Sequence, residues 1–300
     1  MSDIIINDPR KIYQYKKDDR RPIFNVVNEN NLYSEYKLYF ESHVKLPQNE
    51  TNIAYGHYFK AKKDSGKLII ILHGYGHNAK QCMFYFPPQF AKQGISSLIL
   101  TLPFHGERKK YGKNDGEDFF VLDPTTMLSR FRQIVVDVRT LIDFTENNSI
   151  QNVKEISIFG LSLGGMSAVI TMGVDKRIKK GIFVLAGGNI AKIFWKSIAT
   201  FPLRSYVYAI KQSHDISQKE KEYTEISLLY DPLTFAKFIK NRKVIMINGI
   251  QDPVIPRSST NELRKLLRNP PIIYLPGGHG SIMIFRKLIA KKIVRFLLGK

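Results

Sequence analysis

Short apolar runs alternate with amphipathic segments from residue 67 onward. The runs are continuous and rich in β-branched residues, as expected of strands buried on both faces of a sheet. They cover residues 67–72, 97–102, 155–159, 181–185, 243–247 and 272–275. Between them, apolar residues recur with helical spacing over residues 79–93, 127–147, 165–173, 258–268 and 281–298. This alternation predicts an α/β fold with a mostly parallel central sheet and helices on both faces.

Two segments depart from the alternation. Residues 31–63 predict antiparallel strands, for example over 35–40 and 54–59, and such an edge is common in large α/β domains. Residues 189–240 are rich in aromatic side chains and too long for a simple crossover, which predicts a helical cap insertion. The alternative is a set of extra helices at the periphery. We therefore expect an N-terminal extension over 1–30 and one domain over 31–300.

The segment Gly160-Leu161-Ser162-Leu163-Gly164 directly follows an apolar run and precedes a helical pattern. It has the form G-x-S-x-G of a nucleophile elbow, a sharp turn that projects a serine hydroxyl from the end of a sheet. The glycines fit because a Cβ at either position would collide with the neighbouring strand or helix. A plain strand-to-helix turn is the alternative for the pentapeptide alone. Ser162 is the candidate nucleophile.

A serine hydroxyl needs a base to accept its proton, and histidine is the usual one. His279 stands in the loop after the last apolar run, where the sites of α/β proteins collect. His73 and His105 also follow apolar runs, whereas the remaining four histidines lack such a place. His279 is therefore the candidate base.

The base in turn needs an acid that fixes its tautomer. Asp252 follows the apolar run 243–247 and belongs in a loop at the carboxyl end of a strand. Asp231 is the weaker alternative because Asp231-Pro232 reads as a helix cap or turn. The order along the chain is then Ser162, Asp252, His279.

An oxyanion hole requires two preorganised N–H donors. We expect one from the backbone of Leu163, the residue after the nucleophile. The other is expected from the glycine-rich loop His73-Gly74-Tyr75-Gly76, with the Tyr75 N–H as the candidate. A glycine-rich turn with no ligand is the alternative for that loop.

Five segments in order resemble the signature segments of the α/β-hydrolase superfamily, and most closely its dienelactone-hydrolase/prolyl-oligopeptidase-like esterase branch. They are Leu72-His73-Gly74-Tyr75-Gly76, Leu102-Pro103-Phe104-His105-Gly106, the stretch 160–165, the stretch 248–256 and Gly278-His279-Gly280. The resemblance runs from about residue 32 to the C-terminus and implies an α/β-hydrolase fold. Dienelactone hydrolases use cysteine as the nucleophile, whereas this chain has Ser162. No propeller-sized N-terminal region of a full prolyl oligopeptidase is present.

The resemblance also bears on the segment after the second parallel strand. A histidine at the position of His105 is usually structural there, and we expect the same here. Arg108, Lys109 and Lys110 follow it and could bind an acidic substrate. A solvated loop is the better expectation for these three residues.

Composition adds constraints on compartment. The single cysteine, Cys82, excludes an intramolecular disulfide. Residues 1–21 carry four aspartates and no long apolar stretch, so we expect no signal peptide there. No apolar segment approaches the roughly 20 residues that span a bilayer. These features predict a soluble, cytoplasmic protein.

The formal net charge of +20 is concentrated in the second half, where residues 151–300 hold 25 basic and 9 acidic side chains. Such a field could attract nucleic acid, anionic lipid or acidic substrates. No nucleic-acid-binding motif accompanies it, so we expect a basic solvated surface and no nucleic-acid partner.

The residues together predict a serine esterase that acts on a small-molecule carboxylic ester through an acyl-enzyme. A peptidase, amidase or thioesterase with the same triad is the main alternative, and a non-catalytic basic binding protein is a remote one. We expect no cofactor and no metal, since no cysteine or histidine cluster has zinc spacing. The sequence indicates no oligomeric state.

Overall fold

The apolar runs form neighbouring strands of one sheet. The computed structural model describes the whole chain except residues 1–6, 147–149, 151–152, 202–204, 206–220 and 222. Nine strands lie in the described part: β1 (Ile23–Glu29), β2 (Tyr33–Glu41), β3 (Ile53–Ala61), β4 (Lys67–Leu72), β5 (Ile95–Leu100), β6 (Glu155–Leu161), β7 (Ile178–Val184), β8 (Lys243–Gly249) and β9 (Ile272–Leu275). All six predicted runs are strands, with bounds shifted by at most a few residues.

The sheet is antiparallel at one side and parallel over the rest. Its strand order is β1-β2-β3-β5-β4-β6-β7-β8-β9. The pairs among β1, β2, β3 and β5 are antiparallel, and every pair from β5 through β4 to β9 is parallel. The predicted antiparallel edge before a parallel sheet is therefore confirmed.

Strand β4 shows why its sequence is continuously apolar. Leu68, Ile70 and Leu72 belong to the hydrophobic core on one face of the sheet, and Ile69 and Ile71 to the core on the other. Side chains alternate between the faces of a strand, so a strand covered on both faces is mostly apolar.

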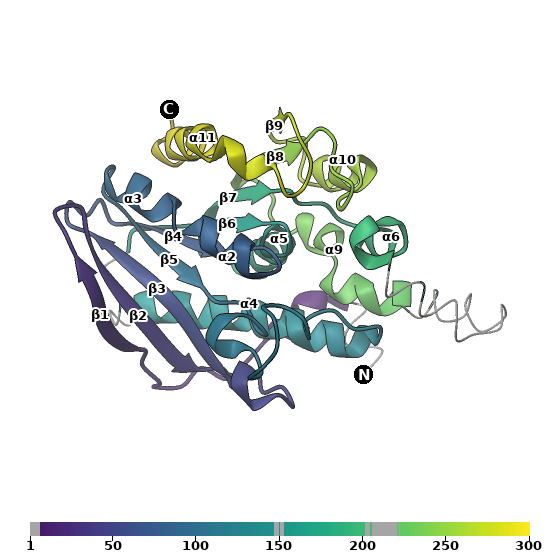
Figure 1. Cartoon of the computed structure of the whole chain (residues 1–300), viewed down its shortest axis with the longest axis horizontal. Coiled ribbons are helices and arrows are strands. Elements are labelled where there is room, and N and C mark those ends of the chain that lie inside the picture. Colours follow the sequence, from purple (N-terminus) through teal and green to yellow (C-terminus); the bar gives the residue numbers. More distant parts are fainter. Residues whose placement is uncertain (1–6, 147–149, 151–152, 202–204, 206–220, 222) are drawn as a thin grey trace.

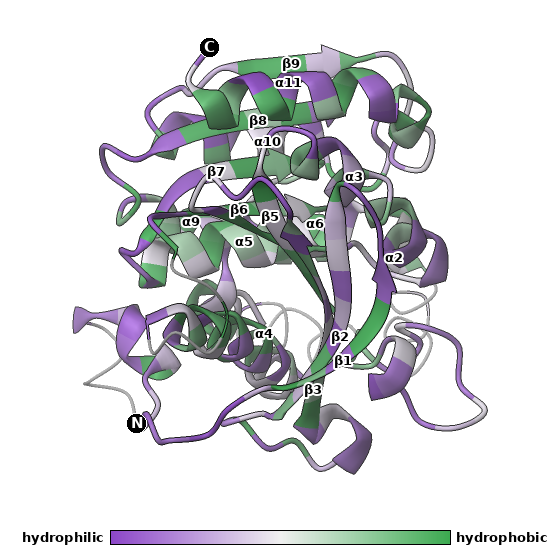
Figure 2. Ribbon diagram, turned by 90° about the vertical axis from the view of Figure 1, so that its left-hand side faces the viewer, coloured by the Kyte–Doolittle hydropathy of each residue, from purple (hydrophilic) through white to green (hydrophobic). Residues whose placement is uncertain are grey.

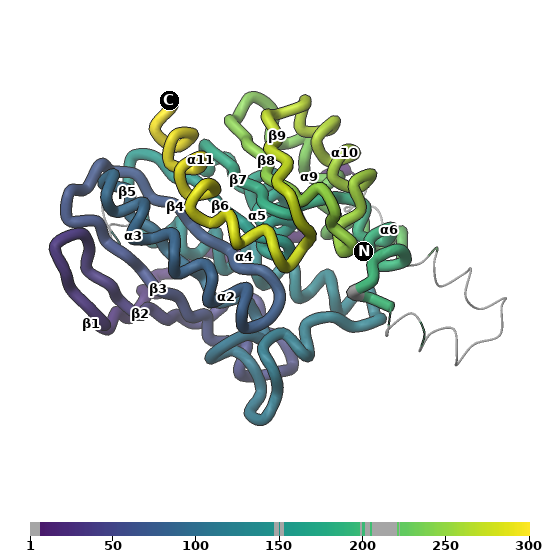
Figure 3. The backbone as a smooth tube through the Cα atoms, turned by 45° about the horizontal axis from the view of Figure 1, so that its top comes forward, coloured from purple at the N-terminus to yellow at the C-terminus, as the bar shows by residue number. Residues whose placement is uncertain are grey.

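Helices cover both faces of the sheet (Figure 1). Within the described residues, the α-helices are α2 (His77–Met83), α3 (Phe86–Ala91), α4 (Pro124–Glu146), α5 (Leu163–Val174), α6 (Ile190–Lys196), α9 (Pro232–Ala236), α10 (Arg257–Leu266) and α11 (Arg286–Leu298). Residues of α3 and α11 share one core, and those of α4, α5 and α9 share the other. Figure 3, with the first of these faces brought forward, shows α2, α3 and α11 over the strands. The prediction of a parallel sheet with helices on both faces is confirmed.

The last helix is amphipathic and packs onto the sheet. Figure 2 shows hydrophobic and hydrophilic residues alternating along α11, beside the hydrophobic strands β8 and β9. Ile289, Ile293 and Leu297 are buried in the core that includes Ile247 of β8. A short 3₁₀ turn, η6 (Ile282–Phe285), leads from the His279 loop into this helix.

The helix expected over residues 79–93 is two helices, α2 and α3, with a break at Phe84 and Tyr85. Pro87 and Pro88 explain the break. Proline lacks the N–H of an interior helical residue and is tolerated in the first turn, where these two prolines lie in α3. The apolar spacing continued through the break and concealed it.

Residues assigned by sequence to an N-terminal extension contribute to the domain. The 3₁₀ turn η1 (Pro9–Tyr13) places Tyr13 in the core with no exposed surface, and its hydroxyl donates to the carbonyl of Leu229 at 2.9 Å. Strand β1 pairs with β2 at the edge of the sheet. Strand β1 is mostly exposed although it contains Ile23, Phe24, Val26 and Val27, and it was not expected from the sequence.

The cap insertion expected over 189–240 stays a prediction, because much of it lies outside the described residues. The described parts include α6, the 3₁₀ turns η4 (Ile198–Thr200) and η5 (Leu228–Tyr230), and α9.

Arg108 corrects the expectation of a solvated loop over 108–110. Its guanidinium is fully buried and pairs with the buried carboxylate of Asp137 on α4, with Nη2 to Oδ2 at 2.8 Å. It also donates to the backbone carbonyls of Thr51 and Thr101, and Ser42 donates to the other oxygen of Asp137. Burial raises the pKa of Asp137, and the charge of Arg108 acts in the opposite direction. The pair joins α4 to the ends of the antiparallel strands.

We predict that Asp137→Asn lowers the free energy of unfolding by about 3–5 kcal/mol, because it leaves the Arg108 charge buried without a counter-charge. Urea denaturation of the variant and the wild type measures the loss. Glu41→Gln removes the acid of an exposed ion pair with Lys45 and is the control, expected to change stability little. Similar losses in both variants would contradict the role given to the buried pair.

Candidate active site

Ser162 lies in the sharp turn between β6 and α5, in a strained backbone conformation. Its φ is 54° and its ψ is −114°, outside the conformations that residues with side chains usually adopt. The Ser162 N–H donates to the carbonyl of Val184 on β7 at 2.8 Å, and its own carbonyl accepts from Met166 within α5. Both flanking elements therefore hold the turn in place.

The two glycines of the pentapeptide allow close approach of backbones: Gly160 lets β6 approach α5, and Gly164 lets α5 approach the end of β4. A Cβ on Gly160 would lie 2.1 Å from the carbonyl oxygen of Gly164, and one on Gly164 would lie 2.2 Å from that of Leu72. The obstructing atoms are backbone, so they cannot move aside as a side chain could. The expected reason for both glycines is confirmed.

The structure brings together the three residues selected from the sequence. Ser162 Oγ lies 2.7 Å from His279 Nε2, and His279 Nδ1 lies 2.8 Å from Asp252 Oδ2. The three side chains come from the loops after β6, β9 and β8. Because these strands are parallel, their carboxyl ends lie along one edge of the sheet, which makes the meeting possible.

The hydrogen bonds of Asp252 leave one oxygen for His279. Its Oδ1 accepts from the N–H groups of Val254 and Ile255 at 2.8 and 2.9 Å, while Oδ2 faces the imidazole. The Asp252 side chain is only 4% exposed, so water has little access to this contact. With Nδ1 protonated towards the carboxylate, Nε2 is left to accept the proton of Ser162.

Asp231, the alternative acid, serves as a helix cap. Its carboxylate accepts from the N–H of Leu233 at the start of α9 and from the N–H groups of Asn189 and Ile190 before α6. This buried side chain therefore fixes two helix starts, and the cap interpretation of Asp231-Pro232 is confirmed.

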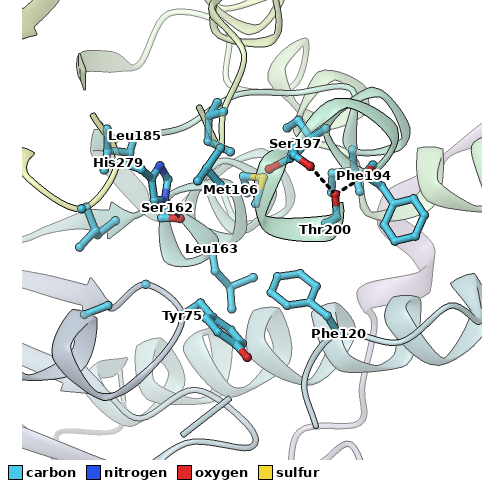
Figure 4. Close-up of a pocket in the computed structure, with 18 of the residues that line it drawn as sticks. Tyr75, Phe120, Ser162, Leu163, Met166, Leu185, Phe194, Ser197, Thr200 and His279 are labelled. Atoms are coloured by element: carbon cyan, nitrogen blue, oxygen red, sulfur yellow. Dashed lines mark hydrogen bonds between the residues drawn. The ribbon is translucent and has the colours of Figure 1, made fainter. Parts of the chain in front are cut away.

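The two residues expected to donate to an oxyanion line the same cavity as Ser162 (Figure 4). Leu163 is the first residue of α5, and the N–H groups of the first helical turn have no partner within the helix. The loop before Tyr75 packs against the nucleophile, since a Cβ on Gly74 would lie 3.5 Å from Ser162 Cβ. The role of both backbones stays a prediction.

Two buried histidines hold the loop that carries Tyr75. His73 Nε2 accepts from the N–H of Leu102 at 3.0 Å, and its Nδ1 lies 2.6 Å from the Gly74 carbonyl oxygen. His105 Nε2 accepts from the N–H of Gly76 at 3.1 Å, and its Nδ1 lies 2.9 Å from the Pro103 carbonyl oxygen. Each ring thus links the loop after β4 to the segment after β5. These contacts support the structural role expected of His105, whereas sequence reasoning did not identify the matching role of His73.

Burial keeps both rings neutral at ordinary pH. It lowers the pKa of His105 to about 4 and that of His73 well below its usual value, with mutual repulsion adding to the effect on His73. A neutral ring can accept a backbone N–H on one nitrogen and donate from the other, as both rings do here.

A cavity of about 730 Å³ opens from Ser162 and His279. Its walls are mostly apolar and come from elements distant in sequence. They include Met127 and Phe131 of α4, Met166 of α5, and Ile190, Ile193 and Phe194 of α6. The chemistry of the site is therefore a nucleophile, a base and an acid facing an apolar chamber.

Within the described residues, no group of three or more His, Cys, Asp or Glu side chains is arranged to hold a metal ion. Across the same part of the chain, no helix has the length and apolar character needed to cross a membrane.

No protein-family model matches the chain. It is 21% identical over 187 residues to an uncharacterized protein of Mycobacterium tuberculosis (strain H37Rv), covering 62% of this chain and 42% of that protein. The chain thus spans about two-fifths of that relative. It is also 21% identical over 208 residues to the Bacillus subtilis (strain 168) protein described as "Putative esterase YitV", covering 67% of this chain and 74% of that protein.

Solved structures of esterases share the fold. The acetyl xylan esterase from Paenibacillus sp. R4 superimposes with a TM-score of 0.69 at 17% identity, covering 98% of this chain and 93% of that one. At this identity the likeness concerns the fold, and the chain has the α/β-hydrolase fold. Its assignment to the dienelactone-hydrolase/prolyl-oligopeptidase-like branch stays a prediction.

We predict that the buried ring of His105 makes the stability depend on pH. Its pKa is about 4 in the folded chain and near 6.5 when unfolded, so between these values the unfolded state binds more protons. Above about pH 6.5 this group does not lower the free energy of unfolding. As the pH falls from 6.5 towards 4, the free energy of unfolding decreases by about 1.4 kcal/mol per pH unit. Urea denaturation at pH 7, 6 and 5 should show this loss, and His105→Gln should reduce its slope. The exposed imidazole of His77, replaced in His77→Gln, provides the control. An unchanged slope in His105→Gln would be the contrary result.

Proposed function

We propose that this chain is a serine hydrolase that cleaves carboxylic esters through an acyl-enzyme intermediate. The observation that carries the proposal is the hydrogen-bonded sequence from Asp252 through His279 to Ser162, which ends at the mouth of an apolar cavity. The α/β-hydrolase fold, shared with solved esterases, supports the same reading.

In the first half of the reaction, Ser162 Oγ attacks the ester carbonyl carbon while its proton passes to His279 Nε2. Asp252 holds the Nδ1–H of the ring and stabilises the imidazolium that forms. The carbon–oxygen bond to the alcohol then breaks, and His279 returns the proton to the departing oxygen. The alcohol leaves, and the acyl group stays on Ser162.

The carbonyl oxygen becomes negatively charged in the tetrahedral intermediate. The N–H groups of Leu163 and Tyr75 would stabilise it, each contributing about 3 kcal/mol to lowering the barrier. Backbone donors suit this task because they are already oriented before the reaction. The hydrogen bonds of His73 with Leu102 and of His105 with Gly76 hold the Tyr75 loop in place.

In the second half, water takes the place of the alcohol. His279 removes a proton from the water, whose oxygen attacks the acyl carbon, and the proton then passes to Ser162 Oγ as the acid is released. The enzyme returns to its starting state, and the net reaction is hydrolysis of one ester to an acid and an alcohol.

We predict that Ser162→Ala abolishes hydrolysis of p-nitrophenyl esters and labelling by a fluorophosphonate probe, because the oxygen that forms the acyl-enzyme is gone. Ser258→Ala, at an exposed serine of α10, is the control and should keep both properties. A matching panel of p-nitroanilides and thioesters tells an esterase from an amidase or thioesterase. Hydrolysis that persists in Ser162→Ala would overturn the assignment.

We predict that Asp252→Asn lowers kcat by about 10⁴-fold, because the amide favours the wrong tautomer of His279. Steady-state kinetics on a p-nitrophenyl ester measures the effect. Asp231→Asn serves as the comparison: it weakens two helix starts and should lower stability while the folded fraction keeps its kcat. The reverse result, a catalytic loss in Asp231→Asn alone, would make Asp231 the acid.

A further inference from the structure

We propose that the chamber between α4, α5 and α6 binds the acyl chain of the ester, and that the preferred substrates carry straight acyl chains of medium length. The proposal rests on the function proposed above. It assigns the two ends of the substrate to two different parts of the cavity. An enzyme built this way would process acetyl esters poorly and medium-chain fatty esters well.

The position of His279 decides which end is which. The departing alcohol oxygen must receive its proton from His279 Nε2, so the alcohol lies on the His279 side of Ser162. The acyl chain, attached to the other side of the carbonyl carbon, then extends away from His279. Figure 4 shows the cavity in this direction, with Ser162 and His279 at one end and Phe194, Ser197 and Thr200 at the other.

The His279 side is open to solvent. Beside His279 the cavity is lined by Gly280, which is exposed, and by Met283 of η6, which is partly exposed. The other exposed lining residues are Tyr75, Asn78 and Glu117. An alcohol of varied size or polarity can leave in this direction without being buried. This part of the cavity therefore sets no narrow requirement on the alcohol.

The opposite side is enclosed and apolar. Six side chains from the three helices form its walls, and each is less than a tenth exposed: Met127, Phe131, Met166, Ile190, Ile193 and Phe194. Tyr223 also lines this end and stacks on Phe194, with ring centroids 4.7 Å apart. Such walls exclude water and favour a hydrocarbon chain over a charged or hydroxylated group.

The Thr200 hydroxyl at the far end is bonded to the protein backbone. The Thr200 hydroxyl donates to the carbonyls of Phe194 and Ser197, as the dashed lines in Figure 4 mark. A hydroxyl engaged in this way offers less to a polar substrate. The far end therefore presents itself to a ligand mainly as an apolar surface.

The volume indicates the length of the chain. The cavity of about 730 Å³ is far larger than an acetyl group, which would leave most of it to water. A medium-length acyl chain covers more of the apolar wall. Each methylene that enters adds about 0.8 kcal/mol of transfer free energy, equivalent to about fourfold in kcat/KM.

The test is a series of p-nitrophenyl esters with acetyl, butyryl, octanoyl and dodecanoyl groups, all below their critical micelle concentrations. We expect kcat/KM to rise about fifteenfold from acetate to butyrate and to be highest at octanoate or dodecanoate. A decrease from acetate onward, with hydrolysis still dependent on Ser162, would overturn the acyl-chamber proposal alone. Absence of both ester hydrolysis and fluorophosphonate labelling would instead overturn the proposed function.

A matched pair of variants locates the effect. Ile193→Trp fills the chamber and should lower the octanoate-to-acetate ratio of kcat/KM at least tenfold. Ile198→Trp makes the same replacement at a side chain that is 64% exposed and outside the cavity lining, and should leave the ratio as it is. Met127→Trp narrows the chamber from α4 and replaces Ile193→Trp if that variant does not fold. Equal ratios in the chamber variants and in Ile198→Trp would also contradict the proposal.

Discussion

The close approach of β6 to α5 is the constraint on which the rest of the site depends. Gly160 permits this approach, Gly164 permits α5 to approach β4, and the turn between the two glycines holds Ser162 at a positive φ. This one conformation points the hydroxyl out of the sheet edge and places the next N–H, that of Leu163, at the start of a helix. Strain of this kind persists only where the surroundings over-determine it, and here β7 and the rest of α5 both bond to the serine backbone. The proposed nucleophile and one proposed oxyanion donor are thus two results of a single turn.

The loops that complete the site follow parallel strands along one edge of the sheet, and hydrogen bonds within the protein hold each of them. Asp252 is held by the N–H groups that follow it, and the Tyr75 loop is held by His73 and His105. The apolar chamber, in contrast, is assembled from α4, α5 and α6, so its shape follows helix packing and can vary independently of the loops. This separation explains how one fold can keep its reacting groups while its substrate range changes.

Most of the fold and the three central side chains could be predicted from the sequence, because their signals are local. A strand covered on both faces is mostly apolar, and Ser162, Asp252 and His279 each follow an apolar strand within a few residues. The features that the sequence analysis missed have weaker signals or signals from distant residues. Strand β1 is mostly exposed, the break before Pro87 is hidden by continuing apolar spacing, and Arg108 is paired with a residue 29 positions later. The apolar chamber could not be predicted either, because its walls come from α4, α5 and α6, which are distant in the sequence.

The buried pair of Arg108 and Asp137 also constrains how this chain can diverge. Either residue alone is a charge in the core, so a single substitution at either position passes through a destabilised intermediate, whereas replacing both together with apolar residues can be neutral. The two positions are therefore expected to change in concert among relatives. The Arg108 guanidinium also donates to the carbonyls of Thr51 and Thr101, so it links the pair to the segments that precede β3 and follow β5. A relative without the segment around Thr51 would need another acceptor for Arg108, which lies three residues after His105.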